Sequence, residues 1–331
     1  MCAASKRHSL DAEKPAVLQM FSVVIPLFNK RTTITDTLRS LRDQSFPAAE
    51  IIVVDDGSDD GGPEIVRAFD PSIRILPTSS PRSGPSAARN VGIKAAAQEW
   101  VAFLDADDLW SREYLASVRE AIEKGGPGVI GAFTAWKYTN GNGEKVNPFS
   151  RHQPQVGTLD LRGFLRAWLS DRFCPIWTSA CAFKTASLIK VGMFEEAVRR
   201  GEDKQLWLKM LAEGRAAYTV SPLATYNMNV TGQLTSKPPT ELHPVCSAID
   251  QIRPSQPPEI QTLLDRLYNL QVWQYATQVK LAYRLPRTML GEFRVALNPL
   301  HFAILLGLIT VPTALQQMMG RILLGRRAGA S

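Results

Sequence analysis

Short apolar runs alternate with helical patterns across the first hundred residues, and this order restricts the fold more than any other feature. The apolar runs are residues 21–27, 50–56, 73–76 and 100–104, and the helical patterns are residues 34–41, 63–69 and 87–97. When a helix separates two strands, the second strand usually runs parallel to the first. The order therefore predicts an α/β fold with a mostly parallel sheet flanked by helices.

The rest of the chain divides by composition. Residues 1–20 are charged and have no apolar stretch long enough for a signal peptide, so we expect a flexible tail. One α/β domain is expected over residues 21–235, and a proline-rich linker over residues 236–259, which contain "SKPPTELHP" and "RPSQPPE". A helical extension, residues 260–331, is expected to follow, because residues 260–283 have apolar positions at helical spacing.

The extension contains an uncharged apolar segment, residues 295–320, which includes "FAILLGLITVPTAL". Arginines flank the segment on both sides, and prolines and glutamines interrupt the run of about twenty apolar residues that a bilayer crossing needs. We expect it to associate with a membrane surface, as an in-plane or re-entrant helix pair does. A full span and a helix buried against the soluble core are the alternatives.

The net charge limits the classes of binding partner, and the cysteine content limits the kinds of metal site and the cellular compartment. The formal net charge is +7, which suits phosphates or acidic lipid headgroups. Basic residues form no stripe interleaved with aromatic residues, so nucleic acid is not expected as a partner. The four cysteines lack metal-ligand spacing, which argues against a zinc site or a disulfide framework and favours a cytoplasmic setting.

The run at residues 100–104 leads into three carboxylates, Asp105, Asp107 and Asp108. Because side chains alternate along an extended chain, Asp105 and Asp107 point the same way if the extension persists. Two converging carboxylates suit Mg²⁺ or Mn²⁺ bound together with a phosphate. The alternative is that Asp107 or Asp108 caps the helix that begins near Ser111, although a cap needs only one acid.

A second acidic pair, Asp55 and Asp56, ends the run at residues 50–56 and precedes Gly57. Ligands of open α/β sheets bind at the carboxyl ends of the strands, where both acidic clusters are expected to lie. A carboxylate there could accept hydrogen bonds from a base or a ribose. The alternative is an ordinary turn, because Asp, Gly and Ser are all good turn formers.

Five motifs occur along the chain: "SVVIPLFNK", "IIVVDDGSDD", "GPSAARNVGIKAA", "WVAFLDADDLW" and "GEDKQLWLKML". In this order and spacing they resemble the motifs of family 2 glycosyltransferases, and the resemblance covers residues 21–230. It implies the GT-A fold, a Rossmann-like domain that binds a nucleoside diphosphate sugar. A UDP-sugar is the expected donor.

The resemblance assigns a nucleotide-binding role to several residues. Pro26 and Asn29 would line the nucleotide pocket at the end of the first strand. Asp56, with Asp55 as the close alternative, would hold a uracil-type base. Arg89 of "AARN" would reach the base or the diphosphate, whereas the same arginine taken alone would more often be a solvated residue on a helix face.

The resemblance also implies the reacting groups. Asp105 would contact the ribose, and Asp107 would hold the metal ion, with Asp108 supporting it. Asp203 of "GEDKQLWLKML" would be the catalytic base, and Glu202 would support it. From the residues alone, Asp203 at the start of a helix would more often be a cap or a partner of the helix dipole.

These assignments imply an inverting transfer of one sugar, dependent on Mn²⁺ or Mg²⁺, to a hydroxyl of a glycan or lipid-linked acceptor. The chain has no QxxRW-type motif of processive synthases, which favours single-sugar transfer. With the apolar segment, the resemblance suggests polysaccharide or cell-envelope biosynthesis at the cytoplasmic face of a membrane.

Two other functions remain open on the sequence. One is a metal-dependent phosphohydrolase with Asp55 or Asp56 as nucleophile, although the accompanying loop and later lysine are not found. The other is a noncatalytic membrane-associated protein that binds nucleotide sugars. A dehydrogenase is disfavoured because no GxGxxG follows the first apolar run.

Overall fold

The structure is a computed structural model that describes residues 20–140, 143–151, 153–198, 200–227, 244–282 and Ala303. Its strands are β1 (Phe21–Leu27), β2 (Glu50–Asp55), β3 (Arg74–Pro77), β4 (Trp100–Phe103), β5 (Leu109–Trp110), β6 (Val129–Asn140), β7 (Gly143–Val146), β8 (Val156–Leu159), β9 (Cys181–Lys184) and β10 (Arg215–Asn227). Its longer helices are α1 (Ile34–Arg42), α2 (Gly62–Phe69), α3 (Pro85–Ala95), α4 (Tyr114–Gly125), α5 (Leu161–Asp171), α6 (Thr185–Lys190), α7 (Glu202–Glu213), α8 (Val245–Ile252) and α9 (Pro258–Ala282). The predicted α/β class is therefore confirmed.

All of these strands join one sheet, in the order β3-β2-β1-β4-β9-β6-β10-β5, with β7 beside β6 and β8 beside β10. The first four strands are mutually parallel, and we call them the parallel half. The remaining strands, here the mixed half, combine a parallel β6–β10 pair with antiparallel pairs to β5, β7, β8 and β9. The expectation of a mostly parallel sheet thus holds for the parallel half, whereas the sheet as a whole is mixed.

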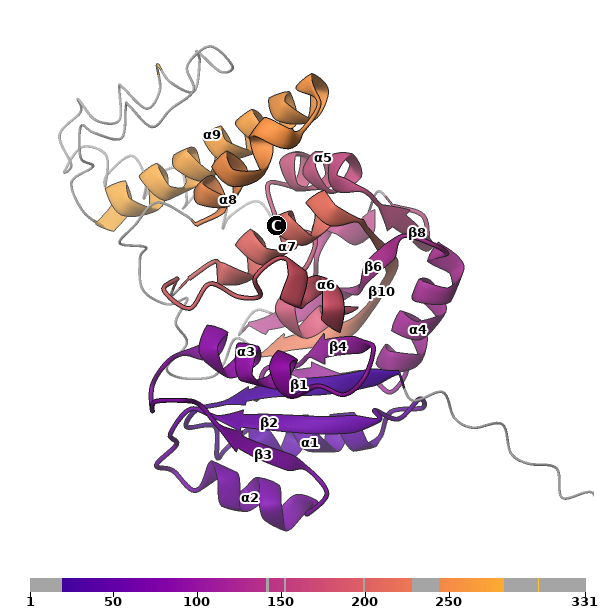
Figure 1. The fold of residues 1–331 in the computed structure, drawn as a ribbon, viewed down its shortest axis with the longest axis vertical. Coiled ribbons are helices and arrows are strands. Elements are labelled where there is room, and N and C mark those ends of the chain that lie inside the picture. The colour runs from indigo at the N-terminus through magenta and orange to yellow at the C-terminus, as the bar shows by residue number, and fades with distance from the viewer. Residues whose placement is uncertain are drawn as a thin grey trace, which may run out of the picture.

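Both faces of the sheet are covered by helices, because its strands bury alternate residues on opposite sides. In β1, Val23 and Ile25 belong to the hydrophobic cluster that includes α1 and α4, whereas Val24 belongs to the cluster that includes α5 and α7. Figure 1 shows α1 and α2 on one side of the sheet and α8 and α9 at the end of the molecule far from α2. The core therefore forms two layers separated by the sheet.

Part of the predicted linker is a packed helix, which corrects the expectation for residues 236–259. Helix α8 buries Val245, Ala248 and Ile249 in the same cluster as α7, and α9 begins at Pro258. Prolines fit the first turn of a helix because the missing N–H has no partner there. Of the prolines that the structure describes here, Pro244 directly precedes α8 and Pro258 begins α9, so these two lie at helix boundaries.

The structure describes part of the predicted helical extension and almost none of the predicted N-terminal tail. The amphipathic helix expected over residues 260–283 corresponds to α9, whose Leu264, Leu267 and Val272 are buried. The flexible tail expected over residues 1–20 lies outside the described residues except for Met20, and so does the apolar segment, residues 295–320, except for Ala303. Among the helices that are described, none combines the length and hydropathy needed to cross a bilayer.

Candidate functional site

The candidate site lies where the strands of the parallel half end, at the edge formed by the loops after β1, β2 and β4. The loop after β1 contacts both of the others: the Asn29 side chain and Asp59 exchange hydrogen bonds at 2.8 and 3.0 Å, and the Thr33 hydroxyl donates to the Ala106 carbonyl at 2.9 Å. Both acidic clusters are therefore on one edge of the sheet, as predicted for strand ends.

Arg89 connects the two sequence-distant acidic regions. Its Nη2 donates to Asp105 Oδ1 at 2.7 Å, and its Nη1 donates to Glu202 Oε1 at 3.1 Å. The side chain is 5% exposed, and its guanidinium lies over the ring of Phe194. Burial alone would lower the pKa of Arg89, but the charges of Asp105 and Glu202 more than offset it and raise that pKa. Arg89 thus joins the end of β4 to the start of α7.

The close packing of α3 on β1 fixes the position of Arg89. Gly92, one turn further along the helix, faces Val24, and a Cβ at Gly92 would lie 2.3 Å from Val24 Cγ1. Only glycine permits this approach, so the "AARNVG" stretch places the arginine and the contact with the sheet on one helical face. The alternative of a solvated helix-face arginine is therefore wrong.

Glu202 and Asp203 occupy the first turn of α7, which follows Gly201 in the left-handed conformation (φ 82°). Asp203 Oδ2 accepts from the Thr178 hydroxyl at 3.3 Å, and Oδ1 accepts from the Lys204 N–H at 2.7 Å. Burial and the neighbouring charge of Asp203 raise the pKa of Glu202, while Arg89 opposes the rise. The favourable position of Asp203 at the positive end of a helix and a role as base are compatible.

The three carboxylates after β4 are held by three different partners. The extension ends at Phe103, and a turn closes with the Asp108 N–H donating to the Asp105 carbonyl at 3.0 Å. Asp107 Oδ2 lies 2.6 Å from Lys30 Nζ. Helix α4 begins only at Tyr114 and has no side-chain cap, so neither Asp107 nor Asp108 caps it.

Asp108 is the least accessible of the three carboxylates, and its supporting role at a metal ion stays a prediction. It is 1% exposed and accepts from the Ser179 hydroxyl at 2.6 Å, while the Asp105 N–H donates to the same hydroxyl at 3.0 Å. Burial, and then the charges of Asp105 and Asp107, raise the pKa of Asp108 well above its usual range. Asp107 is therefore the more accessible of the two acids assigned to the metal ion.

The donors that fit Mg²⁺ or Mn²⁺ are the hard oxygens of Asp107, with Asp105 next to it. In the described part of the chain, no cluster of three or more histidine, cysteine or acidic side chains forms a ready-made metal site. Asp105 and Asp107 are each already paired, with Arg89 and Lys30.

The loop after β2 separates the roles of its two acids. Asp56 is buried and accepts from Thr78 Oγ1 and the N–H groups of Ser83 and Gly84, at 2.8, 2.9 and 2.7 Å. Asp55 accepts from the Ser58 N–H at 3.0 Å and is half-buried. The structure therefore favours Asp55 over Asp56 as the residue available to a ligand.

Asn29 and Pro26 lie at the end of β1. Asn29 has a left-handed backbone (φ 52°), and its side chain exchanges two hydrogen bonds with Asp59, at 2.8 and 3.0 Å. Asparagine tolerates this conformation better than most residues, which explains its presence at the turn. Pro26 is half-buried and pairs in register with Val54 of β2. Both residues shape the loop in which a nucleotide would lie.

Several residues at this edge escaped the sequence analysis. Lys30 follows Asn29 inside the "PLFNK" motif, so its position was a signal that could have been used. Phe28 is exposed, and the Arg82 guanidinium lies 5.7 Å from the centre of its ring. Thr178 and Ser179 contact Asp203 and Asp108, but an ordinary polar pair before a strand carries no sequence signal.

Sequence relatives of the chain are glycosyltransferases. TuaG of Bacillus subtilis, a putative teichuronic acid biosynthesis glycosyltransferase, is 29% identical over 213 residues, which is 63% of this chain and 79% of TuaG. TarS of Staphylococcus aureus, a poly(ribitol-phosphate) β-N-acetylglucosaminyltransferase, is 34% identical over 151 residues, 44% of this chain and 26% of TarS. An uncharacterized glycosyltransferase of Rickettsia felis is 29% identical over 192 residues, and the chain spans only 30% of its length.

Solved structures share the fold. TarS 1–349 of S. aureus in complex with UDP-GlcNAc superposes with a TM-score of 0.66 at 19% identity, over 88% of each chain. The mannosyltransferase PcManGT of Pyrobaculum calidifontis, in complex with GDP-Man and Mn²⁺, superposes with a TM-score of 0.55 at 21% identity, over 90% of this chain and 83% of the other. These neighbours confirm the predicted GT-A fold.

The family follows from a sequence model rather than from these structural likenesses. The model described as "Glycosyl transferase family 2" matches residues 22–192, just over half of the chain, and includes every motif of the parallel half. The edge at which Arg89 joins Asp105 to Glu202 lies in and directly after this region. The chain therefore belongs to glycosyl transferase family 2.

Proposed function

We propose that the protein transfers one sugar from a nucleoside diphosphate sugar to an acceptor hydroxyl, with inversion at the anomeric carbon. The observation that carries the proposal is the double contact of Arg89 with Asp105 and Glu202. It holds Asp105, which would bind the donor, near Glu202, whose neighbour Asp203 would activate the acceptor. Such a union of a binding group and a base is what a single displacement requires.

The donor would lie along the edge of the parallel half. The half-buried Asp55 would accept hydrogen bonds from a base, and Asp105 would contact the ribose. The exposed Phe28 offers an aromatic face next to them. A UDP-sugar is the donor we propose, supported by the UDP-GlcNAc bound in the structure of TarS.

Asp203 would act as the general base. The acceptor oxygen attacks the anomeric carbon and forms the new C–O bond, while the bond from that carbon to the diphosphate oxygen breaks. The hydroxyl proton passes to Asp203, and the nucleoside diphosphate leaves with the electron pair. The hydrogen bonds from Thr178 and Lys204 hold the Asp203 carboxylate in a fixed orientation for this role.

Asp107, with Asp105 beside it, would hold Mn²⁺ or Mg²⁺. When bound, the cation supplies Lewis-acid stabilisation of the charge on the departing diphosphate. Lys30, paired with Asp107 at 2.6 Å, would then be released to contact a phosphate oxygen. PcManGT bound to GDP-Man and Mn²⁺ is a neighbour that supports this assignment.

Stereochemistry tests this proposal without knowledge of the acceptor, because water can replace it. The full chain is incubated with α-linked UDP- and GDP-sugars and Mn²⁺, and the anomeric proton of the released sugar is followed by NMR before mutarotation. We expect the β-anomer to appear first, and only with Mn²⁺ or Mg²⁺ present. Release of the α-anomer, or no release from any donor, would contradict inverting transfer.

We also propose a glycan or lipid-linked acceptor of the cell envelope, at the cytoplasmic face of a membrane. TuaG, a putative teichuronic acid biosynthesis glycosyltransferase, and TarS, a poly(ribitol-phosphate) β-N-acetylglucosaminyltransferase, support this setting. The apolar segment, residues 295–320, supports the membrane contact. Deletion of the residues after Arg294 should move the protein from the membrane to the soluble fraction, and unchanged fractionation would count against the anchor.

A further inference from the structure

We propose that a cavity in the mixed half is the acceptor subsite and binds an uncharged sugar ring. The inference rests on the proposed function and names the class of molecule that receives the sugar. The cavity has a volume of about 610 Å³ and lies between β6, β7 and the turn that joins α5 to the segment before β9. This volume is large enough for a small ligand.

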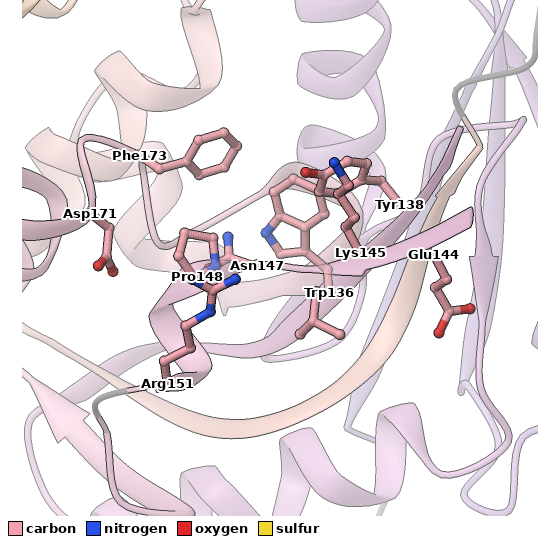
Figure 2. Close-up of a pocket in the computed structure, with 10 residues that line it drawn as sticks. Trp136, Tyr138, Glu144, Lys145, Asn147, Pro148, Arg151, Asp171 and Phe173 are labelled. Atoms are coloured by element: carbon pink, nitrogen blue, oxygen red, sulfur yellow. The ribbon is translucent and has the colours of Figure 1, made fainter. Parts of the chain in front are cut away.

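The walls of the cavity combine aromatic and polar side chains. Figure 2 shows Trp136 in the middle of the lining, with Phe173 and Asp171 to one side of it and Tyr138, Lys145 and Glu144 to the other. The rings of Trp136 and Phe173 are 5.6 Å apart and tilted by 42°. Phe173 is 44% exposed, so one aromatic face is open to a ligand. Aromatic faces are negative and attract the C–H groups of a sugar ring.

Two buried donors in this wall have no partner among the described residues. They are Trp136 Nε1 and Asn147 Nδ2, in side chains that are 5% and 1% exposed. The other groups of Asn147 are used: Oδ1 accepts from the Phe149 N–H at 2.8 Å, and its N–H donates to the Trp136 carbonyl at 2.8 Å. Figure 2 places the indole nitrogen on the side of the Trp136 ring that faces Asn147.

An unsatisfied buried N–H is costly, and a ligand rich in oxygen would remove that cost. Sugar hydroxyls supply such acceptors together with the C–H faces that suit the two rings. A hydrocarbon chain would fill the apolar part of the cavity but leave both donors unpaired. The pattern of donors and rings therefore favours a sugar over a lipid tail.

The charges around the cavity nearly balance, which favours an uncharged ring. Glu144 is paired with Lys137 at 2.9 Å, and the other charged residues of the lining are Lys145, Arg151 and Asp171. A cavity for a phosphate or a carboxylate would need a clearer excess of basic side chains. The single net positive charge that remains is small.

Aromatic contacts connect this cavity to the proposed base. Trp136 lies 4.9 Å from Trp177, and Trp177 lies 5.2 Å from Tyr226, measured between ring centres. Trp177 immediately precedes Thr178, whose hydroxyl donates to Asp203 at 3.3 Å. Trp136, Trp177 and Thr178 therefore form a series of contacts that leads from the cavity toward Asp203.

Saturation-transfer NMR on the full chain tests the subsite. The probes are the methyl β-glycosides of glucose, galactose and N-acetylglucosamine, and hexan-1-ol serves as a purely apolar comparison. We expect saturation to reach at least one glycoside more strongly than hexanol. Phe173→Ala should lower this signal at least threefold, and Trp136→Phe, which keeps a ring but removes the N–H, should also lower it.

Ile189→Ala is the matched control, because Ile189 is 51% exposed, similar to Phe173, but lies on α6 outside the cavity. Its glycoside signal should equal that of the wild type. The inference is overturned if no glycoside exceeds hexanol, or if Phe173→Ala and Trp136→Phe both match the control. The anomeric assay keeps the two proposals apart: donor turnover without glycoside binding overturns the subsite alone, and glycoside binding without turnover overturns sugar transfer alone.

Discussion

The parallel half and the mixed half of the sheet carry different chemistry. The edge of the parallel half concentrates charge, with Asp55, Asp107, Lys30 and Arg89 close to the strand ends. The mixed half concentrates aromatic rings, which run in contact from the cavity to Trp177. Charged edges suit a diphosphate, and aromatic walls suit a sugar ring. Under the two proposals above, donor and acceptor recognition are divided between the halves, and Asp203 lies between the two sites.

The largest effect is expected from Asp203→Asn, which removes the base but keeps the shape of the side chain. General base catalysis contributes about 10²–10⁴-fold, so donor turnover should fall by a factor in that range. The rate of nucleoside diphosphate release measures it. Asp43→Asn, an exposed acid on the far side of α1, is the matched control and should retain wild-type turnover. Full turnover by Asp203→Asn would show that Asp203 is not the general base.

Arg89→Met tests whether the arginine holds the halves together. The substitution leaves the partly buried Asp105 and Glu202 without their cation, and breaking a buried ion pair costs up to about 3–5 kcal/mol. We expect that loss in the free energy of unfolding, measured in urea. The exposed pair of Arg67 and Glu64 provides the control, because Arg67→Met should cost well under 1 kcal/mol. A small loss for Arg89→Met would show that the contact is not structural.

Two glycines of the core, one in each half of the molecule, pack closely against neighbouring side chains. A Cβ at Gly92 would lie 2.3 Å from Val24, and a Cβ at Gly131 would lie 2.3 Å from Phe183. Each Gly→Ala change should destabilise by about 1–3 kcal/mol through overpacking. Only Gly92→Ala, in the helix that carries Arg89, should also weaken donor binding. Gly163→Ala is the control, since its nearest neighbour is the flexible end of Leu159, and it should be close to neutral.

The smallest effect is a pH dependence from Glu202. Burial, and then the charge of Asp203, raise the pKa of Glu202 above its ordinary value of 4.5. The folded state therefore binds more protons than the unfolded state above that pH, and stability falls as pH rises through the folded pKa. Glu202→Gln keeps an acceptor for Arg89 and should make this fall smaller, and the part that remains is due to Asp108, whose pKa is also raised. Melting temperatures from pH 4 to 8 measure it, with exposed Glu123→Gln as a control that should keep the wild-type slope.

The parallel half was largely predictable because its signals are local. The predicted run at residues 21–27 coincides with β1, and the other runs there lie within about two residues of β2, β3 and β4. Acidic residues lie at the carboxyl ends of these strands, and the ends of parallel strands share one edge of the sheet. The sequence could therefore predict that Asp55 and Asp105 lie at the same edge. The choice between Asp55 and Asp56 was not predictable, because the loop that saturates Asp56 comes from residues 78–84.

The mixed half was less predictable because long-range pairing builds it. Strand β9 enters the sheet antiparallel between β4 and β6, and no local pattern specifies that neighbour. Trp136 and Phe173 are unremarkable in sequence and meet only through this packing. The linker predicted over residues 236–259 was partly wrong for a different reason. Proline occurs in the first turn of helices as well as in linkers, and here it lies at the start of α8 and α9.

We propose that the parallel half binds the donor and that the base takes no part in donor binding. Isothermal titration with the UDP- or GDP-sugar that the anomeric assay selects tests this directly. With Mn²⁺ present, we expect Asp107→Ala to lose at least tenfold in donor affinity and Asp203→Asn to bind within about twofold of the wild type. Equal affinities for the wild type and Asp107→Ala, or a loss of binding confined to Asp203→Asn, would contradict donor binding by the parallel half.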